Sequence, residues 1–226
     1  MAGVMQLLGK RTKIPPMRTP QLRAGIAGLT FAILYLFANS ALASIPLAPT
    51  GNDTGEEIAR YFDRNSATVL ILDLVLVVSL GFLVWFAYAF RATLVSVKGA
   101  RGRSPEVLVA ASIAAATVVV CATALAPLTG LKSLTPIEAR TVWDLGTTLS
   151  VLFVLPLALI TAAIAISTRG SAFPKWVWVT SVALIPVLLF AFVAWLSIKL
   201  WCLWIAALSI SLLRGRRWNR ELTGST

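Results

Sequence analysis

The chain has 226 residues, of which 58% are hydrophobic and 13% are charged, and its formal net charge is +11. A soluble domain carries about 25% charged residues, so this composition predicts an integral membrane protein. The chain contains no histidine and two cysteines, which excludes histidine-ligated haem, His-containing zinc sites and Ser-His-Asp catalysis. We therefore expect no cofactor, no metal and no enzymatic activity.

Uncharged runs predict the membrane-spanning segments, because a helix that crosses the bilayer needs about 20 mostly apolar residues. Residues 176–213 are interrupted only by Lys199, and this stretch is too long for one span and barely enough for two. We predict an all-α polytopic membrane helical bundle with six transmembrane helices, at residues 24–44, 67–90, 107–128, 145–168, 174–192 and 194–213. The transmembrane domain, 24–213, then lies between a basic N-terminal segment, 1–23, and a basic tail, 214–226.

The placement of charge predicts the orientation of these spans. The N-terminal segment, the loops 91–106 and 169–175 and the tail are net basic, whereas the loop 45–66 is net acidic. Cytoplasmic loops carry the excess of lysine and arginine, so both termini are expected in the cytoplasm, which requires an even number of spans. A five-span alternative would place the arginines of the tail outside. A cleaved signal peptide is the alternative for the first span, whose apolar run is long for such a signal.

The basic residues have a second expected role besides setting the topology. They are split over four short segments with no interleaved aromatic residues, which argues against a nucleic-acid partner. Anionic lipid head groups are attracted to such segments. We therefore expect membrane lipids, and other membrane-protein subunits, as partners.

The first outer loop contains a predicted amphipathic helix at 55–65. Thr54 and Glu57 have the spacing of a capping box, and Ile58, Tyr61 and Phe62 fall on one helical face. We interpret this segment as a short amphipathic helix on the outer membrane surface. Its favoured role is a helical lead-in to the second span, and the alternative is a lid or a partner-contact helix.

Polar residues inside the predicted spans are the candidate functional residues, because an intramembrane ionisable group is expensive. Asn39, Asp73 and Lys199 are each predicted at about 7.5–9 Å below the outer ends of their spans, at 1.5 Å per residue. Thr147 begins the fourth span near this level. If the helices turn these groups inward, they form one polar cluster with an Asp73–Lys199 ion pair. The alternative is that Lys199 snorkels to the surface and Asp73 is neutral or hydrogen-bonded locally.

Three functions are compatible with these features. The first is a non-enzymatic binding or accessory subunit that acts through protein partners or lipids, with the loop 45–66 as its contact surface. The second is a small-solute transporter or channel with an outward-opening polar site around Asn39, Asp73 and Lys199. The third is an intramembrane enzyme with Asp73 or Asp144 as acid or base, for which no further catalytic group is found.

The order of short motifs along the chain resembles a family of actinobacterial six-helix integral membrane proteins that carry a domain of unknown function. The segments that carry the resemblance, which covers most of residues 20–213, are 23–28, 55–62, 155–159 and 173–178. The resemblance implies six spans and a bacterial plasma membrane, and it supplies no activity, cofactor or catalytic residue. Lys199 departs from the purely apolar last span that the family pattern implies.

Overall fold

The structure is a computed structural model that describes residues 18–46, 49–96, 103–124, 134–171, 173–190 and 194–214. All regular secondary structure within these ranges is helical. The helices are α1 (Arg18–Ala43), α2 (Gly55–Ser96), α3 (Ser104–Thr123), α5 (Pro136–Leu152), α6 (Val154–Thr168), α7 (Lys175–Leu189) and α8 (Ala194–Arg214). The predicted all-α class is thereby confirmed. Most of the basic segment 1–23 and of the tail 214–226 lies outside the described residues.

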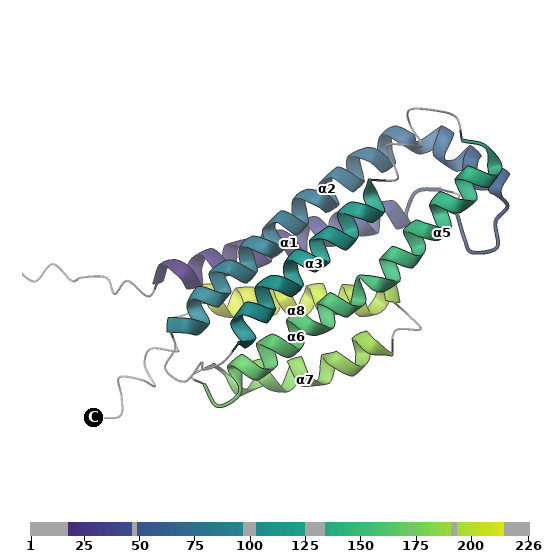
Figure 1. Cartoon of the computed structure of the whole chain (residues 1–226). Helices are drawn as coiled ribbons and strands as arrows, with labels where there is room; N and C mark the ends of the chain where they lie inside the picture. The colour runs from purple at the N-terminus through teal and green to yellow at the C-terminus, as the bar shows by residue number, and fades with distance from the viewer. Residues whose placement is uncertain are drawn as a thin grey trace, which may run out of the picture.

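The helices form a bundle in which successive segments run in alternating directions (Figure 1). We call the end where α1 begins and α8 ends the terminal end, and the opposite end the cap end. α1 packs against α2 and α8, α3 packs against α2 and α6, and α6 packs against α7. Counting α5 and α6 together, five of the described helical segments are long and apolar enough to cross a membrane. α7 is a shorter apolar helix.

The last apolar stretch, 176–213, is divided between α7 and α8, as the charge argument predicts. The two helices run in opposite directions, so α8 returns to the terminal end (Figure 1). The five-span alternative needs one unbroken helix across this stretch, and the structure shows two helices instead. The bundle is therefore compatible with six spans, although α7 has only 15 residues.

The predicted helical segment 55–65 is part of a longer helix in the structure. Residues 55–65 are the first turns of α2, a continuous helix of 42 residues. At 1.5 Å per residue α2 is about 63 Å long, roughly twice the hydrocarbon thickness of a bilayer, so its charged first turns project beyond the apolar part. The segment therefore continues directly into the second predicted span, as the lead-in interpretation expects, and it is not a separate helix.

The fourth predicted span is also longer than expected and is interrupted. α5 begins at Pro136, nine residues before the predicted span 145–168, and α6 follows after the single residue Phe153. Pro156 lacks the N–H that the Leu152 carbonyl would accept from, and its ring crowds that carbonyl, which accounts for the interruption one turn earlier. The ring of Phe153 stacks on Tyr35 of α1, with centroids 6.0 Å apart.

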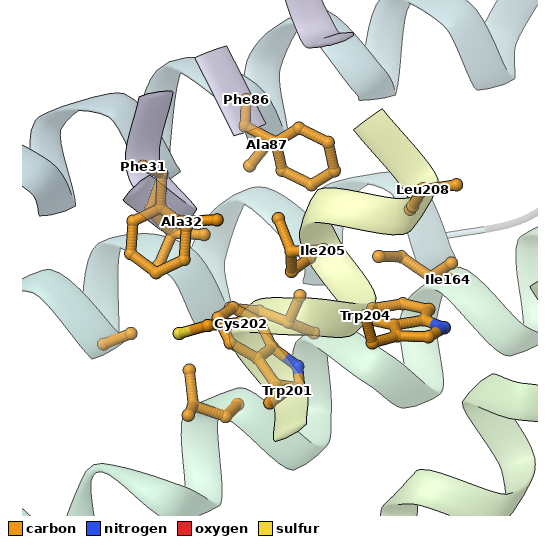
Figure 2. Packing of buried hydrophobic residues seen from close by; sticks show 14 of the residues in the cluster. Phe31, Ala32, Phe86, Ala87, Ile164, Trp201, Cys202, Trp204, Ile205 and Leu208 are labelled. Atoms are coloured by element: carbon orange, nitrogen blue, oxygen red, sulfur yellow. The ribbon is translucent and has the colours of Figure 1, made fainter. Parts of the chain in front are cut away.

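The main core runs along the bundle axis, and α8 contributes its largest side chain. Trp201 is fully buried, and its ring lies edge-on to Phe31 of α1 with centroids 5.7 Å apart (Figure 2). The Trp201 indole N–H donates to Thr161 Oγ1 in α6 at 2.9 Å. This threonine hydroxyl in turn donates to the Leu157 carbonyl at 2.8 Å. The bond from Trp201 ties α8 to α6.

Replacing Thr161 by valine tests this tie. Valine keeps the shape but leaves the Trp201 N–H without an acceptor in an apolar core, so we expect the free energy of unfolding to fall by about 1–3 kcal/mol. The measurement is thermal unfolding of the detergent-solubilised protein. Thr117→Val is the matched control, because Thr117 is exposed and bonds only to the Ile113 carbonyl of its own helix. Equal stability losses in both variants would contradict the prediction.

Candidate functional site

The four predicted intramembrane polar residues come from four different helices. Asn39 in α1 is buried and Lys199 in α8 is half-buried, and both lie near the cap end. Asp73 in α2 is half-buried, whereas Thr147 in α5 is exposed. None of the four is hydrogen-bonded or ion-paired to another of the four. The described residues therefore show no Asp73–Lys199 ion pair, and α2 and α8 each pack mainly against α1.

The predicted contact helix is covered within the chain itself. Ile58 is fully buried, and Tyr61 and Phe62 are each only 7% exposed. They form a small separate core with Val69 and with Ala139 of α5. The apolar face that sequence analysis assigned to a partner is thus covered by the start of α5, and these three side chains are not an open contact surface.

Two equivalent capping boxes begin the helices that meet at the cap end. The Thr54 N–H donates to Glu57 Oε2 at 2.7 Å, and the Glu57 N–H donates to Thr54 Oγ1 at 3.3 Å. Thr135 and Glu138 make the same reciprocal pair at 2.9 and 3.4 Å, with Pro136 as the first helical residue of α5. Each box satisfies backbone donors that a helix start leaves unpaired, so both projecting helix ends are well defined.

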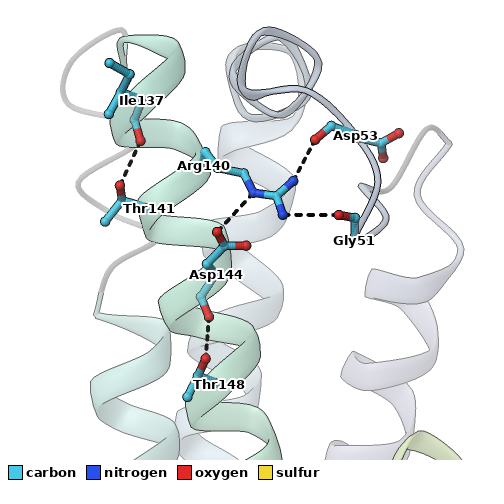
Figure 3. Close-up of polar contacts among 7 residues, drawn as sticks. All are labelled: Gly51, Asp53, Ile137, Arg140, Thr141, Asp144 and Thr148. Carbon is cyan, nitrogen blue, oxygen red and sulfur yellow. Dashed lines mark hydrogen bonds and ion pairs between the residues drawn. The ribbon is translucent and has the colours of Figure 1, made fainter.

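Arg140 joins the loop before α2 to the first turns of α5 (Figure 3). Its Nη1 donates to the Asp53 carbonyl at 2.8 Å, and its Nη2 donates to the Gly51 carbonyl at 3.1 Å. Its Nε donates to Asp144 Oδ2 at 3.0 Å, one turn along the same helix. The planar guanidinium thereby donates to two backbone carbonyls and a carboxylate at the same time. A lysine ammonium lacks this fixed fork of donors and would not reproduce the arrangement.

We call the assembly of residues 49–65 and 134–146 the cap. The two helix starts approach closely within it, because a side chain at Gly55 would collide with the backbone of Pro136. Sequence analysis missed Arg140, Gly55 and the second capping box. The Thr135–Glu138 spacing repeats that of Thr54–Glu57, and this repetition was the signal that could have revealed the start of α5.

A groove of about 370 Å³ lies on the cap, between the loop before α2 and the first turns of α2. Its lining is charged and mixed in sign: Pro49, Thr50, Asp53, Glu57, Arg60, Tyr61, Arg64 and Asn65. The two carboxylates have internal partners, since Asp53 accepts from the Thr50 N–H and Glu57 accepts from Thr54. The lining thus carries two carboxylates and two arginines, so the formal charge of the groove is balanced.

Replacing Arg140 by glutamine tests whether its hydrogen bonds hold the loop before α2 against α5. Loss of the guanidinium removes three charge-assisted hydrogen bonds from a half-exposed site, so we expect the free energy of unfolding to fall by about 2 kcal/mol. Faster protease cleavage in the loop 49–54 should accompany this loss. Asp144→Asn removes only the ion pair and should have less than half the effect. If the loop 49–54 of the Arg140→Gln protein is cleaved at the same rate as in the parent, Arg140 does not hold this loop.

The capping box at Glu57 predicts a dependence of stability on pH. The backbone N–H and hydroxyl of Thr54 donate to this carboxylate and hold its pKa below the ordinary glutamate value. A carboxylate whose pKa is lower in the folded state stabilises the protein above its unfolded pKa, and this contribution is lost as the pH falls through the folded pKa. The parent should therefore have a higher Tm than Glu57→Gln at pH 7. This difference in Tm should disappear once the pH lies below the folded pKa of Glu57. Glu56→Gln, outside the box, should show no such difference at either pH.

No group of three or more Asp, Glu or Cys side chains that could hold a metal ion occurs in the part of the chain that the structure describes. Comparison with known proteins found no matching family model, no matching curated protein and no matching solved structure.

Proposed function

We propose that the chain is a non-enzymatic integral membrane protein of the bacterial plasma membrane, a binding or accessory subunit whose contact surface is the cap. The observation that carries the proposal is the construction of the cap. Two helix starts project beyond the apolar part of the bundle and are fixed by Arg140 and two capping boxes. A surface that is already ordered loses little conformational entropy when a partner binds, so such a projection suits recognition.

The orientation belongs to the same proposal: six spans, with both termini in the cytoplasm and the cap outside. The described charged residues at the terminal end are mainly basic, and they include Arg103, Arg169, Lys175 and Arg214. The cap carries Asp53, Glu56, Glu57, Asp63, Glu138 and Asp144 against three arginines. This asymmetry supports a cytoplasmic terminal end, because positive charge is retained on that side.

Photocrosslinking in native membranes tests the proposed contact surface. A benzophenone side chain at position 63, in place of the exposed Asp63, should capture one partner protein in constant ratio to the chain. The same group in place of Arg103, at the terminal end, is the matched control and should not capture that partner. If position 63 yields no stoichiometric adduct, or if both positions yield the same one, the cap is not the contact surface.

A second candidate function, a small-solute transporter or channel, is favoured by one observation. Thr147 and Ser150 of α5 are exposed. One helical face continues from them into α6, where its residues are buried: Val154, Ala158 and Thr161. The bundle is thus closed around α6 and more open around α5, as an outward-opening site would require.

The transporter hypothesis is tested with the intramembrane charges. Asp73→Asn combined with Lys199→Leu should abolish accumulation of a weakly polar fluorescent dye in membrane vesicles, if the site conducts. Thr117→Val is the matched control, since it alters an exposed residue of α3 away from the site. Unchanged dye flux in the double variant would rule against transport by this route.

A further inference from the structure

The turn between α6 and α7 combines two cations with an aromatic ring at the terminal end (Figure 1). The guanidinium Cζ of Arg169, directly after α6, lies 5.8 Å from the centroid of the Trp178 ring. Lys175 is the first residue of α7 and precedes Trp178 by three positions, so both side chains leave the helix on the same face. Arg169 and Lys175 therefore flank one tryptophan, and both cations are exposed.

The acidic residues of the chain lie elsewhere or are paired. Seven of the nine belong to the cap or to the half of α2 next to it: Asp53, Glu56, Glu57, Asp63, Asp73, Glu138 and Asp144. Glu106 makes a bidentate ion pair with Arg91, at 2.6 and 2.9 Å, and Glu221 belongs to the basic tail outside the described residues. The side chains of Arg169 and Lys175 make no ion pair or hydrogen bond with a described residue.

The start of α7 adds to the positive field of this turn. Its first turn contains no acidic residue, and its N-cap is Pro174, which offers no side-chain acceptor. A lysine at the positive end of a helix dipole is unfavourable unless an anion lies nearby. At the cap end, in contrast, both helix starts carry a glutamate that closes a capping box. The turn between α6 and α7 thus holds positive charge that the described chain does not compensate.

The aromatic residues place these cations at the depth of lipid head groups. Trp176 and Trp178 lie in the first turn of α7, and tryptophan is enriched where the hydrocarbon core meets water. Further along α7, the face of Lys175 and Trp178 is exposed and apolar: Val179, Val182 and Pro186. A nucleic acid or an acidic protein would match only the charged part of this surface. An anionic group with an acyl chain beneath it matches the whole.

We propose that Arg169 and Lys175 bind the phosphate of an anionic phospholipid in the leaflet at the terminal end, with the acyl chains along α7. The contact with Trp178 holds the Arg169 guanidinium in place and leaves its N–H groups for the phosphate oxygens. The ammonium of Lys175 adds a second charge from the other side of the ring. The proposal rests on the membrane placement given under the proposed function and is independent of the protein partner at the cap.

Lipid photolabelling of the full-length protein in phosphatidylcholine nanodiscs tests the site. The probe is a small fraction of phosphatidylglycerol with a diazirine in its acyl chain, and its adducts are mapped by peptide mass spectrometry. Labelling of residues 178–185 is divided by that of residues 107–114 of α3, which lie equally far from their helix start. In the double variant Arg169→Gln/Lys175→Gln this ratio should fall about tenfold, because two cations near the membrane surface are lost.

The matched control removes the same charge from the same end of the bundle. Arg23 and Arg214 are exposed and lie on α1 and α8, where Gly25 is beside Leu213. In Arg23→Gln/Arg214→Gln the ratio should change by less than about twofold, because the general attraction of the basic end acts on all sides of the bundle. Equal falls in the two double variants would show diffuse attraction and overturn the site. All four side chains are exposed, so both variants should elute from size exclusion as the parent does.

Two further arms separate the possible ligands. A phosphatidylcholine diazirine probe should label 178–185 weakly and equally in the parent and in Arg169→Gln/Lys175→Gln. Millimolar inorganic phosphate should not displace the phosphatidylglycerol probe, because it lacks the acyl chain; full displacement would assign the two cations to a free phosphate and overturn the lipid site. Unchanged phosphatidylglycerol labelling in the double variant would also overturn it. Loss of photocrosslinking at position 63 with lipid labelling intact would instead sink only the proposed function.

Discussion

Replacing Gly55 by alanine should destabilise the cap by about 3 kcal/mol, at the upper end of the range for overpacking. The new methyl group would overlap the backbone carbonyl group of Pro136, and the methyl itself is fixed rigidly to the Cα of residue 55. Neither side can move away by a change of rotamer, so the starts of α2 and α5 must separate. This separation would also lengthen the Arg140 hydrogen bonds to the loop before α2.

Thermal unfolding and protease cleavage of the loop 49–54 measure the effect. Gly146→Ala is the matched control, because a methyl group there meets nothing within 4 Å in the described chain. Since alanine favours a helix interior over glycine by about 1 kcal/mol, the control should be neutral or slightly stabilising. A Gly55→Ala protein as stable as the parent would mean that the two helix starts are not held in contact.

Replacing Gly28 by valine should cost about 3 kcal/mol in the transmembrane core. Gly28 allows α1 to approach α8 and α2 closely, and an added Cβ would overlap Ser209 Oγ and lie 2.8 Å from the ring of Phe86. Small residues at helix interfaces in membranes permit the close packing that drives helix association. We expect loss of the bundle core before any loss of helix content.

Ser209 provides an internal test of this packing. Its Oγ is buried and has no hydrogen-bond partner among the described residues, so Ser209→Ala alone should be neutral or stabilising. In the double variant Gly28→Val/Ser209→Ala, removal of the hydroxyl should recover about 1 kcal/mol of the loss. Gly81→Val, in an open position of α2, is the matched control for the valine itself. Additive effects of the two substitutions would contradict direct contact between these sites.

The membrane helices were largely predictable from sequence because apolar runs report on span positions directly. The division of 176–213 followed from charge balance, and the structure places it between α7 and α8. The ends of the helices were not predictable in the same way. α2 begins 12 residues before the apolar run that predicts its span, because a capping box at Thr54 and a helical run of charged residues continue it into water.

The interpretation of the candidate site failed where it needed tertiary information. The face formed by Ile58, Tyr61 and Phe62 was correctly identified as apolar, but sequence periodicity cannot tell whether a partner or the same chain covers it. Arg140 looked like an ordinary loop charge, since its two carbonyl partners are 87 and 89 residues away in the chain. A common depth for Asp73 and Lys199 likewise does not bring them together, because depth says nothing about which helices are neighbours.

The short α7 has a consequence for the surrounding bilayer. Its 15 residues span about 22 Å, less than a hydrocarbon core of about 30 Å. A hydrophobic segment shorter than the local membrane is accommodated by thinning of the adjacent lipid, at a modest elastic cost for each ångström of mismatch. In the six-span placement proposed above, this deformation falls beside α7, and bilayers with longer acyl chains should increase its cost and favour self-association through this helix.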